Sequence, residues 1–143
     1  MKKIVLITAM FLLTLTAATA QIPSEVQASV DKMTYNAMMA RSDGDLKKAE
    51  IITLQAINIV DMQIEGEDSA DLKMGLYYDL ARYYALQNKN KEAVDAFYKA
   101  VENGWCDYQF TVNDGDLSSL KRNKQFNSLM DDMKSNGQML TAR

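Results

Sequence analysis

The sequence predicts an all-α fold built from short antiparallel helical hairpins. Two sets of apolar residues recur at helical spacing: Tyr77, Leu80, Ala81 and Tyr84, and then Ala93, Ala96, Phe97, Ala100 and Val101. A polar break at 87–90 separates the two sets, and two amphipathic helices joined by a short turn form a helical hairpin. No segment shows the alternation that is typical of a strand. We therefore expect a hairpin over 70–103, with helices at 70–86 and 91–102.

The first twenty residues have the pattern of a signal peptide. Lys2 and Lys3 precede an apolar run at 4–15, and Ala18-Thr19-Ala20 forms a small-residue cleavage site. The apolar run is shorter than the roughly 20 residues that a membrane-spanning helix needs. We expect cleavage between Ala20 and Gln21 and export to the bacterial periplasm or exterior, with an uncleaved anchor as the alternative.

Composition excludes several classes of function. The precursor has a net charge of −3, and removing the two lysines of the leader makes it −5, so the chain has no basic footprint for nucleic acid. It contains no His, which leaves zinc sites and Ser-His or Cys-His catalysis without an essential part. The single Cys106 cannot form an internal disulfide. We expect it to be a small apolar residue packed beside Trp105, and a free thiol or an intermolecular bridge stays open as the alternative.

A first hairpin is expected over 21–62, with helices at 25–41 and 46–62. Ser24 with Gln27 reads as a capping box, and Gly44 and Asp45 read as a left-handed turn residue and the next N-cap. The first helix carries an apolar stripe: Val26, Val30, Met33, Ala37 and Ala40. The second helix is apolar on two faces: Ala49, Ile52, Ala56 and Val60, and then Ile51, Leu54, Ile59 and Met62. We expect both of these faces to be packed.

The two hairpins are joined by an acidic, Gly-containing segment, which we read as a loop over 63–69. Asp68 or Ser69 is the expected N-cap of the third helix, and Gly104 is the expected left-handed residue after the fourth.

The remaining chain predicts a C-terminal cap over 104–135. Trp105, Tyr108 and Phe110 are too aromatic for a free loop, so we expect them to fold back on the second hairpin. A last helix is expected at 124–135 from four residues at helical spacing: Phe126, Leu129, Met130 and Met133. Residues 136–143 are expected to fray.

Taken together, these residues resemble the tetratricopeptide (TPR) repeat family. The pattern W-x2-L-G-x2-Y followed by A-x3-F reads here as Tyr77-x2-Leu80-Ala81-x2-Tyr84, then Ala93-x3-Phe97-x2-Ala100. The first hairpin is a degraded copy, and the segment from Gly104 to Leu129 is similar to the closing segment of many bacterial TPR proteins. The resemblance implies a short right-handed α-solenoid of two TPR-like hairpins with a C-terminal capping segment and helix.

In the family, partners lie in a groove lined by the first helix of each repeat. The resemblance places seven residues of this chain there: Asp31, Thr34, Met38, Arg41, Tyr78, Arg82 and Leu86. Two cations, an aromatic and a Met suit a peptide or helix of mixed acidic and apolar character. For Tyr78 and Arg82 the alternative is a solvated face with the ring over the guanidinium. We expect a protein or peptide partner, no nucleic acid and no membrane span in the mature chain.

Other chemistry lacks support in the sequence. Asn113-Asp114-Gly115-Asp116 does not fit a calcium loop, and we read it as a turn and helix cap. The carboxylates at 65–68 read as a solvated loop, with weak calcium binding as the alternative. We expect no enzymatic activity, metal or cofactor. Two further functions stay open. One is a self-associating structural protein, such as a homodimer formed through the second helix, and the other is a carrier that holds a small apolar ligand in a pocket lined by Tyr83, Tyr84 and Trp105.

Overall fold

The computed structural model describes residues 22–141, and the expected leader with its Ala20–Gln21 cleavage site lies outside that range. Throughout this range the secondary structure is helical, without a strand, which confirms the all-α prediction. The elements are α1 (Ser24–Ser42), α2 (Leu46–Gln63), α3 (Glu67–Leu86), α4 (Asn90–Glu102), α5 (Tyr108–Asn113), the 3-10 helix η1 (Gly115–Arg122) and α6 (Lys124–Thr141). No helix within 22–141 is long and apolar enough to cross a membrane.

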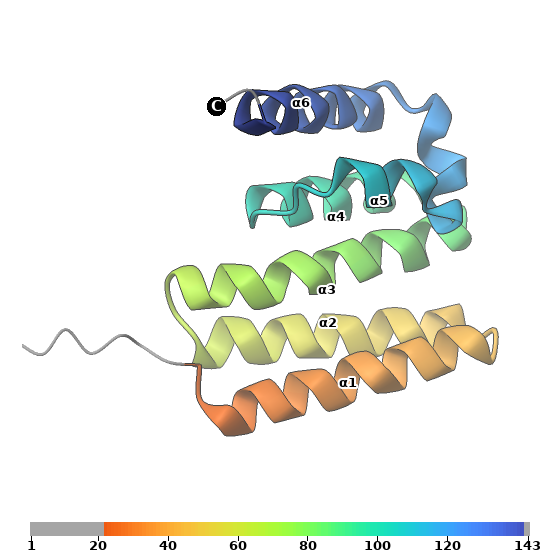
Figure 1. Cartoon of the computed structure of the whole chain (residues 1–143). Helices are drawn as coiled ribbons and strands as arrows, with labels where there is room; N and C mark the ends of the chain where they lie inside the picture. Colours follow the sequence, from red (N-terminus) through yellow and green to blue (C-terminus); the bar gives the residue numbers. More distant parts are fainter. Residues whose placement is uncertain (1–21, 142–143) are drawn as a thin grey trace, which may run out of the picture.

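The helices pack in chain order as a repeat-like stack (Figure 1). The α1–α2 and α3–α4 pairs are antiparallel, and the pairs meet where α2 contacts α3. The C-terminal elements continue the stack, since η1 packs on α3 and α6 packs on α4 and α5. In Figure 1, α1 lies at the bottom, α6 lies at the top, and α5 lies in front of α4.

The turn between α1 and α2 follows the prediction, but the start of α1 does not. Gly44 has a φ of 82°, and the Asp45 side chain accepts a hydrogen bond from the Lys48 amide at 3.0 Å. The capping box at Ser24 is wrong, because Pro23 takes the N-cap position and no side chain caps the helix. The Pro23 carbonyl accepts the first helical hydrogen bonds, so Ser24 lies inside the first turn.

Helix α2 is packed on two sides, but only one of its predicted faces is buried. Ala49, Ala56 and Val60 are fully buried as expected. The second predicted face is wrong, because Ile51, Leu54 and Met62 are 45%, 41% and 76% exposed. The buried residues on the second packed side are Glu50, Thr53 and Ile57.

Hydrogen bonds explain why polar residues occupy this packed side of α2. The Glu50 carboxylate accepts from Lys89 Nζ at 2.6 Å and from Gln87 Nε2 at 3.0 Å, and both donors come from the α3–α4 turn. The Thr53 hydroxyl donates to the Ala49 carbonyl at 2.9 Å. A buried polar group with such partners avoids most of its desolvation cost, so an apolar residue is not required there.

The connection between the hairpins is shorter than the loop expected at 63–69. Helix α3 begins at Glu67, after Gly66 with a φ of 76°, so neither Asp68 nor Ser69 is its N-cap. Ser69 is instead buried within the helix. The additional residues therefore extend α2 and α3 themselves.

The α3–α4 hairpin encloses the core that its sequence pattern predicts. Phe97, Ala81, Ala93 and Ala100 have no exposed surface, while Tyr84 is half-buried. The small alanines let the helix backbones approach, and Phe97 fills the space behind them. Gly104 has a φ of 110° at the end of α4, as expected of a residue after a helix C-terminus.

The cap contains more helix than the sequence indicates. Asp107 accepts from the Phe110 amide at 2.8 Å and starts α5, and Asp114 accepts from the Asp116 amide at 2.9 Å and starts η1. Apolar residues of the cap join the main core, namely Leu117, Leu120, Phe126, Met130 and Met133. Helix α6 continues to Thr141, beyond the end expected at 135, and 142–143 lie outside the described residues.

Candidate functional site

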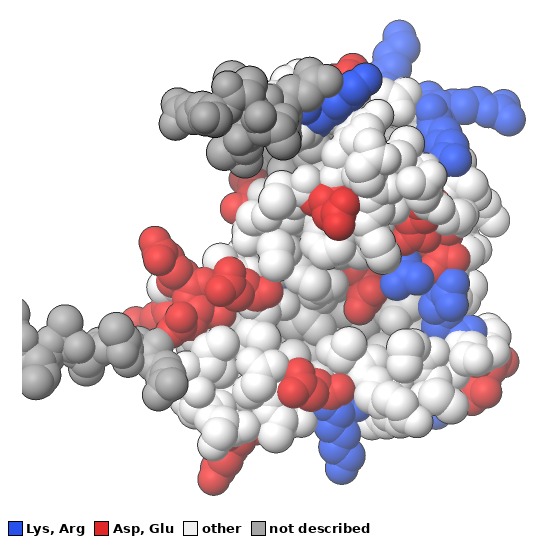
Figure 2. Space-filling model, viewed as in Figure 1, with Lys and Arg blue, Asp and Glu red and all other residues white. Residues whose placement is uncertain are grey.

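An open hollow of about 550 Å³ lies where α3 meets the α5–η1 segment. It is lined by Arg82, Asp107, Gln109, Phe110, Asn113, Asp114 and Gly115. In Figure 2 red and blue side chains meet on the right-hand half of the molecule, between the lower helices and the cap, while most of the surrounding surface is white. The hollow is the candidate site because it joins charged, polar and aromatic side chains from two parts of the chain.

Two arginines and three aspartates form a cluster beside this hollow. Arg41 Nη2 lies 2.6 Å from Asp116 Oδ1, and Arg82 Nη2 lies 2.8 Å from Asp116 Oδ2. Arg82 also pairs with Asp114 at 3.2 Å and with Asp79 at 3.0 Å. This arginine–aspartate cluster therefore ties α1, α3 and η1 together.

Burial and charge shift the ionisation of the cluster. Burial raises the pKa of the Asp79 carboxyl, although the neighbouring Arg82 opposes the shift. Burial also disfavours the charged Arg82 guanidinium, but the carboxylates of Asp114, Asp79 and Asp116 outweigh it and raise the pKa of Arg82. With all five groups charged, the cluster has a net charge of −1, so it presents no surplus cation to a partner.

An aromatic stack lies next to the cluster. The Tyr78 and Trp105 rings are stacked with centroids 4.0 Å apart, and the Tyr78 hydroxyl donates to Asp114 Oδ2 at 2.9 Å. Trp105 Nε1 donates to the Thr111 hydroxyl at 2.9 Å. Burial and the Asp114 carboxylate raise the pKa of Tyr78, which therefore stays a neutral hydrogen-bond donor.

The aromatic segment folds back on the second hairpin as predicted, but Phe110 remains accessible. Its ring centroid lies 5.8 Å from that of Tyr78 and 5.9 Å from that of Trp105. The residue is nevertheless 52% exposed. One side of Phe110 thus packs on the stack while the remainder faces the hollow.

The structure brings together three of the predicted groove residues, although not as a free surface. Arg41 and Arg82 pair with aspartates of the cap, and Tyr78 is only 2% exposed. The solvated alternative for Tyr78 and Arg82 is also wrong, because the Tyr78 ring lies on Trp105. Of the seven predicted residues only Arg82 lines the hollow, and four belong to neither the cluster nor the lining of the hollow: Asp31, Thr34, Met38 and Leu86.

These four residues remain part of the α1 and α3 surface. Asp31 and Met38 are exposed, Thr34 is half-buried, and Leu86 is 37% exposed. Asp31 accepts a hydrogen bond from Gln27 at 2.8 Å.

Sequence reasoning missed Asp79, Asp107 and Phe110 as site residues, and it read Asp114 and Asp116 only as turn and cap residues. The closely spaced aspartates 114 and 116 were a signal, because two carboxylates one residue apart can pair with more than one cation. Asp116 lies 75 residues from Arg41 and 34 residues from Arg82 along the chain, so the sequence alone did not show that they pair.

The expected small-ligand pocket does not form. Tyr83 is buried among small residues of α1 and α2, and burial raises its pKa to about 12. Tyr84 lies with Leu54 in a different surface depression, and Trp105 is stacked on Tyr78. The three side chains therefore do not line one cavity.

Within residues 22–141, no group of three or more Cys, Asp or Glu side chains is placed to hold a metal ion. Cys106 is exposed and forms no disulfide within the described residues, so the packed position expected beside Trp105 is wrong.

The fold places the chain in a broad class, that of helical proteins with a repeat-like packing of antiparallel hairpins. Comparison with family models, with curated proteins and with solved structures gave no match.

Proposed function

We propose that the protein is a non-catalytic, exported interaction module of the TPR type that binds a peptide or helix. The two stacked hairpins with a packed cap support a short right-handed α-solenoid of TPR-like units. The leader pattern at 1–20 supports export to the periplasm or the exterior of a bacterial cell. Stacked repeats need a terminal unit to cover their apolar end, which is the role proposed for the cap.

The observation that carries this proposal is the exposure of Phe110 in the hollow beside the cluster. Large aromatic side chains that stay accessible in a concave, partly polar site are typical contact residues of protein interfaces. Phe110 is held by Tyr78 and Trp105 on one side, so a partner would meet a ring that is already ordered. Ordering before binding lowers the entropy cost of association.

The partner chemistry proposed here differs from the sequence expectation. The sequence indicated an acidic and apolar partner because Arg41 and Arg82 were taken as free cations. Both arginines are paired within the chain, and Asp107 adds a further carboxylate to the lining of the hollow. Charge complementarity therefore favours a basic and apolar peptide.

Blocked peptides test the proposal directly. We expect Ac-Lys-Phe-Lys-Phe-Lys-NH2 to bind the chain at least ten-fold more tightly than Ac-Glu-Phe-Glu-Phe-Glu-NH2 in calorimetric titrations at low salt. Gln109→Lys adds a cation to the lining of the hollow and should weaken binding of the basic peptide. Gln125→Lys, on the exposed surface of α6 and outside the hollow, is the matched control. Equal binding of the two peptides, or equal effects of the two variants, would refute the assignment.

A second candidate function is self-association through α2. Its exposed apolar residues Ile51, Leu54 and Met62 share one side of the helix, which is the kind of surface that a second copy covers. Light scattering distinguishes the two functions. A stable dimer that Leu54→Glu converts to a monomer supports self-association, whereas a monomer at all accessible concentrations excludes it.

A further inference from the structure

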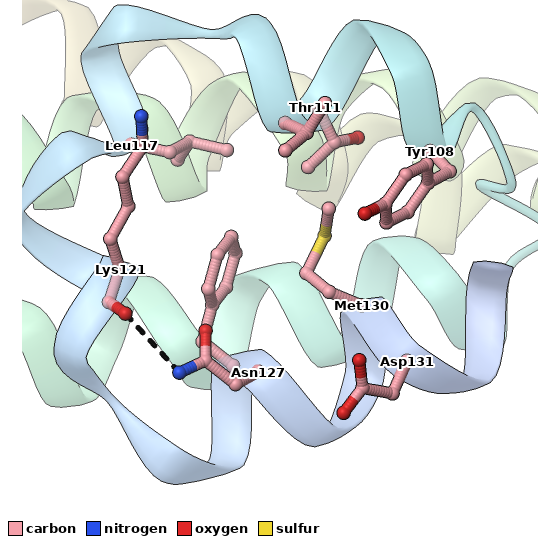
Figure 3. A pocket seen from close by; sticks show the side chains of 9 residues that line it. Tyr108, Thr111, Leu117, Lys121, Asn127, Met130 and Asp131 are labelled. Atoms are coloured by element: carbon pink, nitrogen blue, oxygen red, sulfur yellow. Dashed lines mark hydrogen bonds between the residues drawn. The ribbon is translucent and has the colours of Figure 1, made fainter.

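The cap contains a second depression, separate from the hollow, that no part of the proposed function uses. It has a volume of about 250 Å³ and lies between α5, η1 and α6 (Figure 3). Leu117, Phe126 and Met130 are the buried apolar residues of its lining and are 1%, 4% and 7% exposed, whereas Val112, which also lines it, is 38% exposed. We call this depression the cap pocket.

The walls of the cap pocket are held in place by hydrogen bonds. Asn127 Nδ2 donates to the Lys121 carbonyl at 3.2 Å and fixes the corner between η1 and α6. The Thr111 hydroxyl donates to the Asp107 carbonyl at 2.7 Å and accepts from the Trp105 indole at 2.9 Å. The pocket is therefore formed before any ligand arrives, which favours binding.

The volume of the cap pocket suits one large apolar group. An apolar cavity of about 150 Å³ holds benzene, whereas pockets for whole small-molecule ligands begin at about 300 Å³. The cap pocket, at about 250 Å³, lies between these limits, which suits the insertion of one aromatic side chain.

Two opposite charges flank the apolar lining. Figure 3 shows Lys121 on one side of the cap pocket and Asp131 on the other, with Met130 between them. Both charged residues are exposed, and neither belongs to the ion pairs found among the described residues. Lys134 is also close, with its Nζ 5.9 Å from the ring centroid of Tyr108, but it does not line the pocket, whereas Asp131 does. A chain that crosses the mouth of the pocket would therefore meet Lys121 at one edge and Asp131 at the other.

We propose that the cap pocket is an anchor site for a peptide segment of a protein partner. The segment inserts one large apolar side chain and carries an acidic residue on the Lys121 side and a basic residue on the Asp131 side. A single free amino acid is a poorer match, because its two charges sit on one carbon while the two charges of the pocket lie on opposite sides. A purely apolar lipid chain would pair with neither Lys121 nor Asp131.

The probe is the blocked peptide Ac-Glu-Gly-Phe-Gly-Lys-NH2, titrated into the 15N-labelled full chain and followed by amide chemical shifts. We expect shifts at the cap pocket. Replacing Phe by Ala should reduce affinity at least ten-fold, and Ac-Lys-Gly-Phe-Gly-Lys-NH2 should bind at least three-fold more weakly.

Paired variants locate the binding. Asn127→Trp places a large ring over the pocket and should abolish binding, whereas Ser128→Trp, on the same helix but outside the pocket, should not. Because Asn127→Trp also removes a hydrogen bond, Asp131→Lys gives a second test. Asp131→Lys should lower the affinity for the probe peptide at least three-fold, and Asp132→Lys, which should leave that affinity unchanged, is its control.

Several results would overturn the proposal. The proposal fails if Asn127→Trp binds the probe as tightly as the unchanged chain does, or if the chemical shift changes are confined to amides around Phe110. It also fails if the purified protein contains an extractable apolar molecule, or if the chain forms a dimer that Asn127→Trp dissociates. Gln109→Lys should leave the probe unaffected, so failure at the cap pocket is distinguishable from failure at the hollow.

Discussion

Replacing Asp116 by Asn tests whether the arginine–aspartate cluster holds the cap on the two hairpins. Asp116 is the shared carboxylate, since it accepts hydrogen bonds from Arg41 Nη2 at 2.6 Å and from Arg82 Nε at 3.1 Å. Asn keeps the size of the side chain but removes its charge. Arg82 retains Asp79 and Asp114, whereas Arg41 loses the one carboxylate with which it pairs among the described residues.

The expected loss lies between the values for exposed and fully buried ion pairs. The Asp116 side chain is 14% exposed, and those of Arg82 and Arg41 are 24% and 33% exposed. Removing one partner of a buried pair costs about 3–5 kcal/mol, and exposed pairs contribute about 0–1 kcal/mol. We therefore expect Asp116→Asn to lower the free energy of unfolding by about 2 kcal/mol, which for a chain of this size lowers Tm by about 6–12 °C.

The single tryptophan of the chain makes the assay specific for the cap. Trp105 is stacked on Tyr78 at 4.0 Å, so its fluorescence reports whether the cap stays docked. Urea unfolding followed by fluorescence and by far-ultraviolet circular dichroism compares the cap with the whole helical content. A cap that detaches first gives a fluorescence transition at lower urea than the dichroism transition.

The control is Asp132→Asn, which removes an exposed carboxylate of α6 and should change stability by less than about 0.5 kcal/mol. If Asp116→Asn were as stable as this control, the cluster would not be what fixes the cap, and apolar packing by Leu117 and Leu120 would suffice.

Three further predictions test the core, a turn and a buried charge. Phe97→Ala, which empties a fully buried site, should cost about 3–5 kcal/mol in urea unfolding, and a loss below 1 kcal/mol would contradict the packing. Gly104→Ala should cost about 1–2 kcal/mol because its φ is 110°, whereas Gly75→Ala, inside α3 with open space around it, should be neutral or stabilising by up to about 1 kcal/mol in thermal melts. Burial opposes ionisation of Glu50, but hydrogen bonds from Lys47, Lys89 and Gln87 lower its pKa. Its contribution is therefore complete above the unfolded-state pKa of about 4.3 and is lost as the pH falls through the lower folded-state value. The stability advantage over Glu50→Gln should accordingly shrink on acidification, and a constant difference from pH 7 to pH 3 would contradict this account.

Helix positions were predictable because they depend on neighbours in the sequence. The stripe from Tyr77 to Tyr84 and the stripe from Ala93 to Val101 each repeat within a few residues, and Gly44 and Gly104 mark helix ends by local backbone geometry. Helix starts were less predictable. The helix begins at Ser24 with Pro23 as its N-cap, one residue earlier than expected, and a shift of one residue at a helix end is not determined by local sequence.

The second buried side of α2 was not predictable from hydrophobicity. Ile51 and Leu54 are exposed while Glu50 and Thr53 are buried. The choice depends on Lys89 and Gln87, which reach Glu50 from nearly forty residues further along the chain. Where such donors are present, a charged residue can occupy a packed position that hydropathy alone assigns to an isoleucine.

By itself the sequence determined that the chain is helical and where most turns fall, because helical periodicity is a property of residues three and four positions apart. Only the tertiary structure decided what the expected groove presents. Arg41 and Asp116 are 75 residues apart, and Arg82 and Asp116 are 34 apart. Once packing brings these groups within hydrogen-bond distance, their attraction pairs the two arginines that the sequence alone left as free cations in the groove.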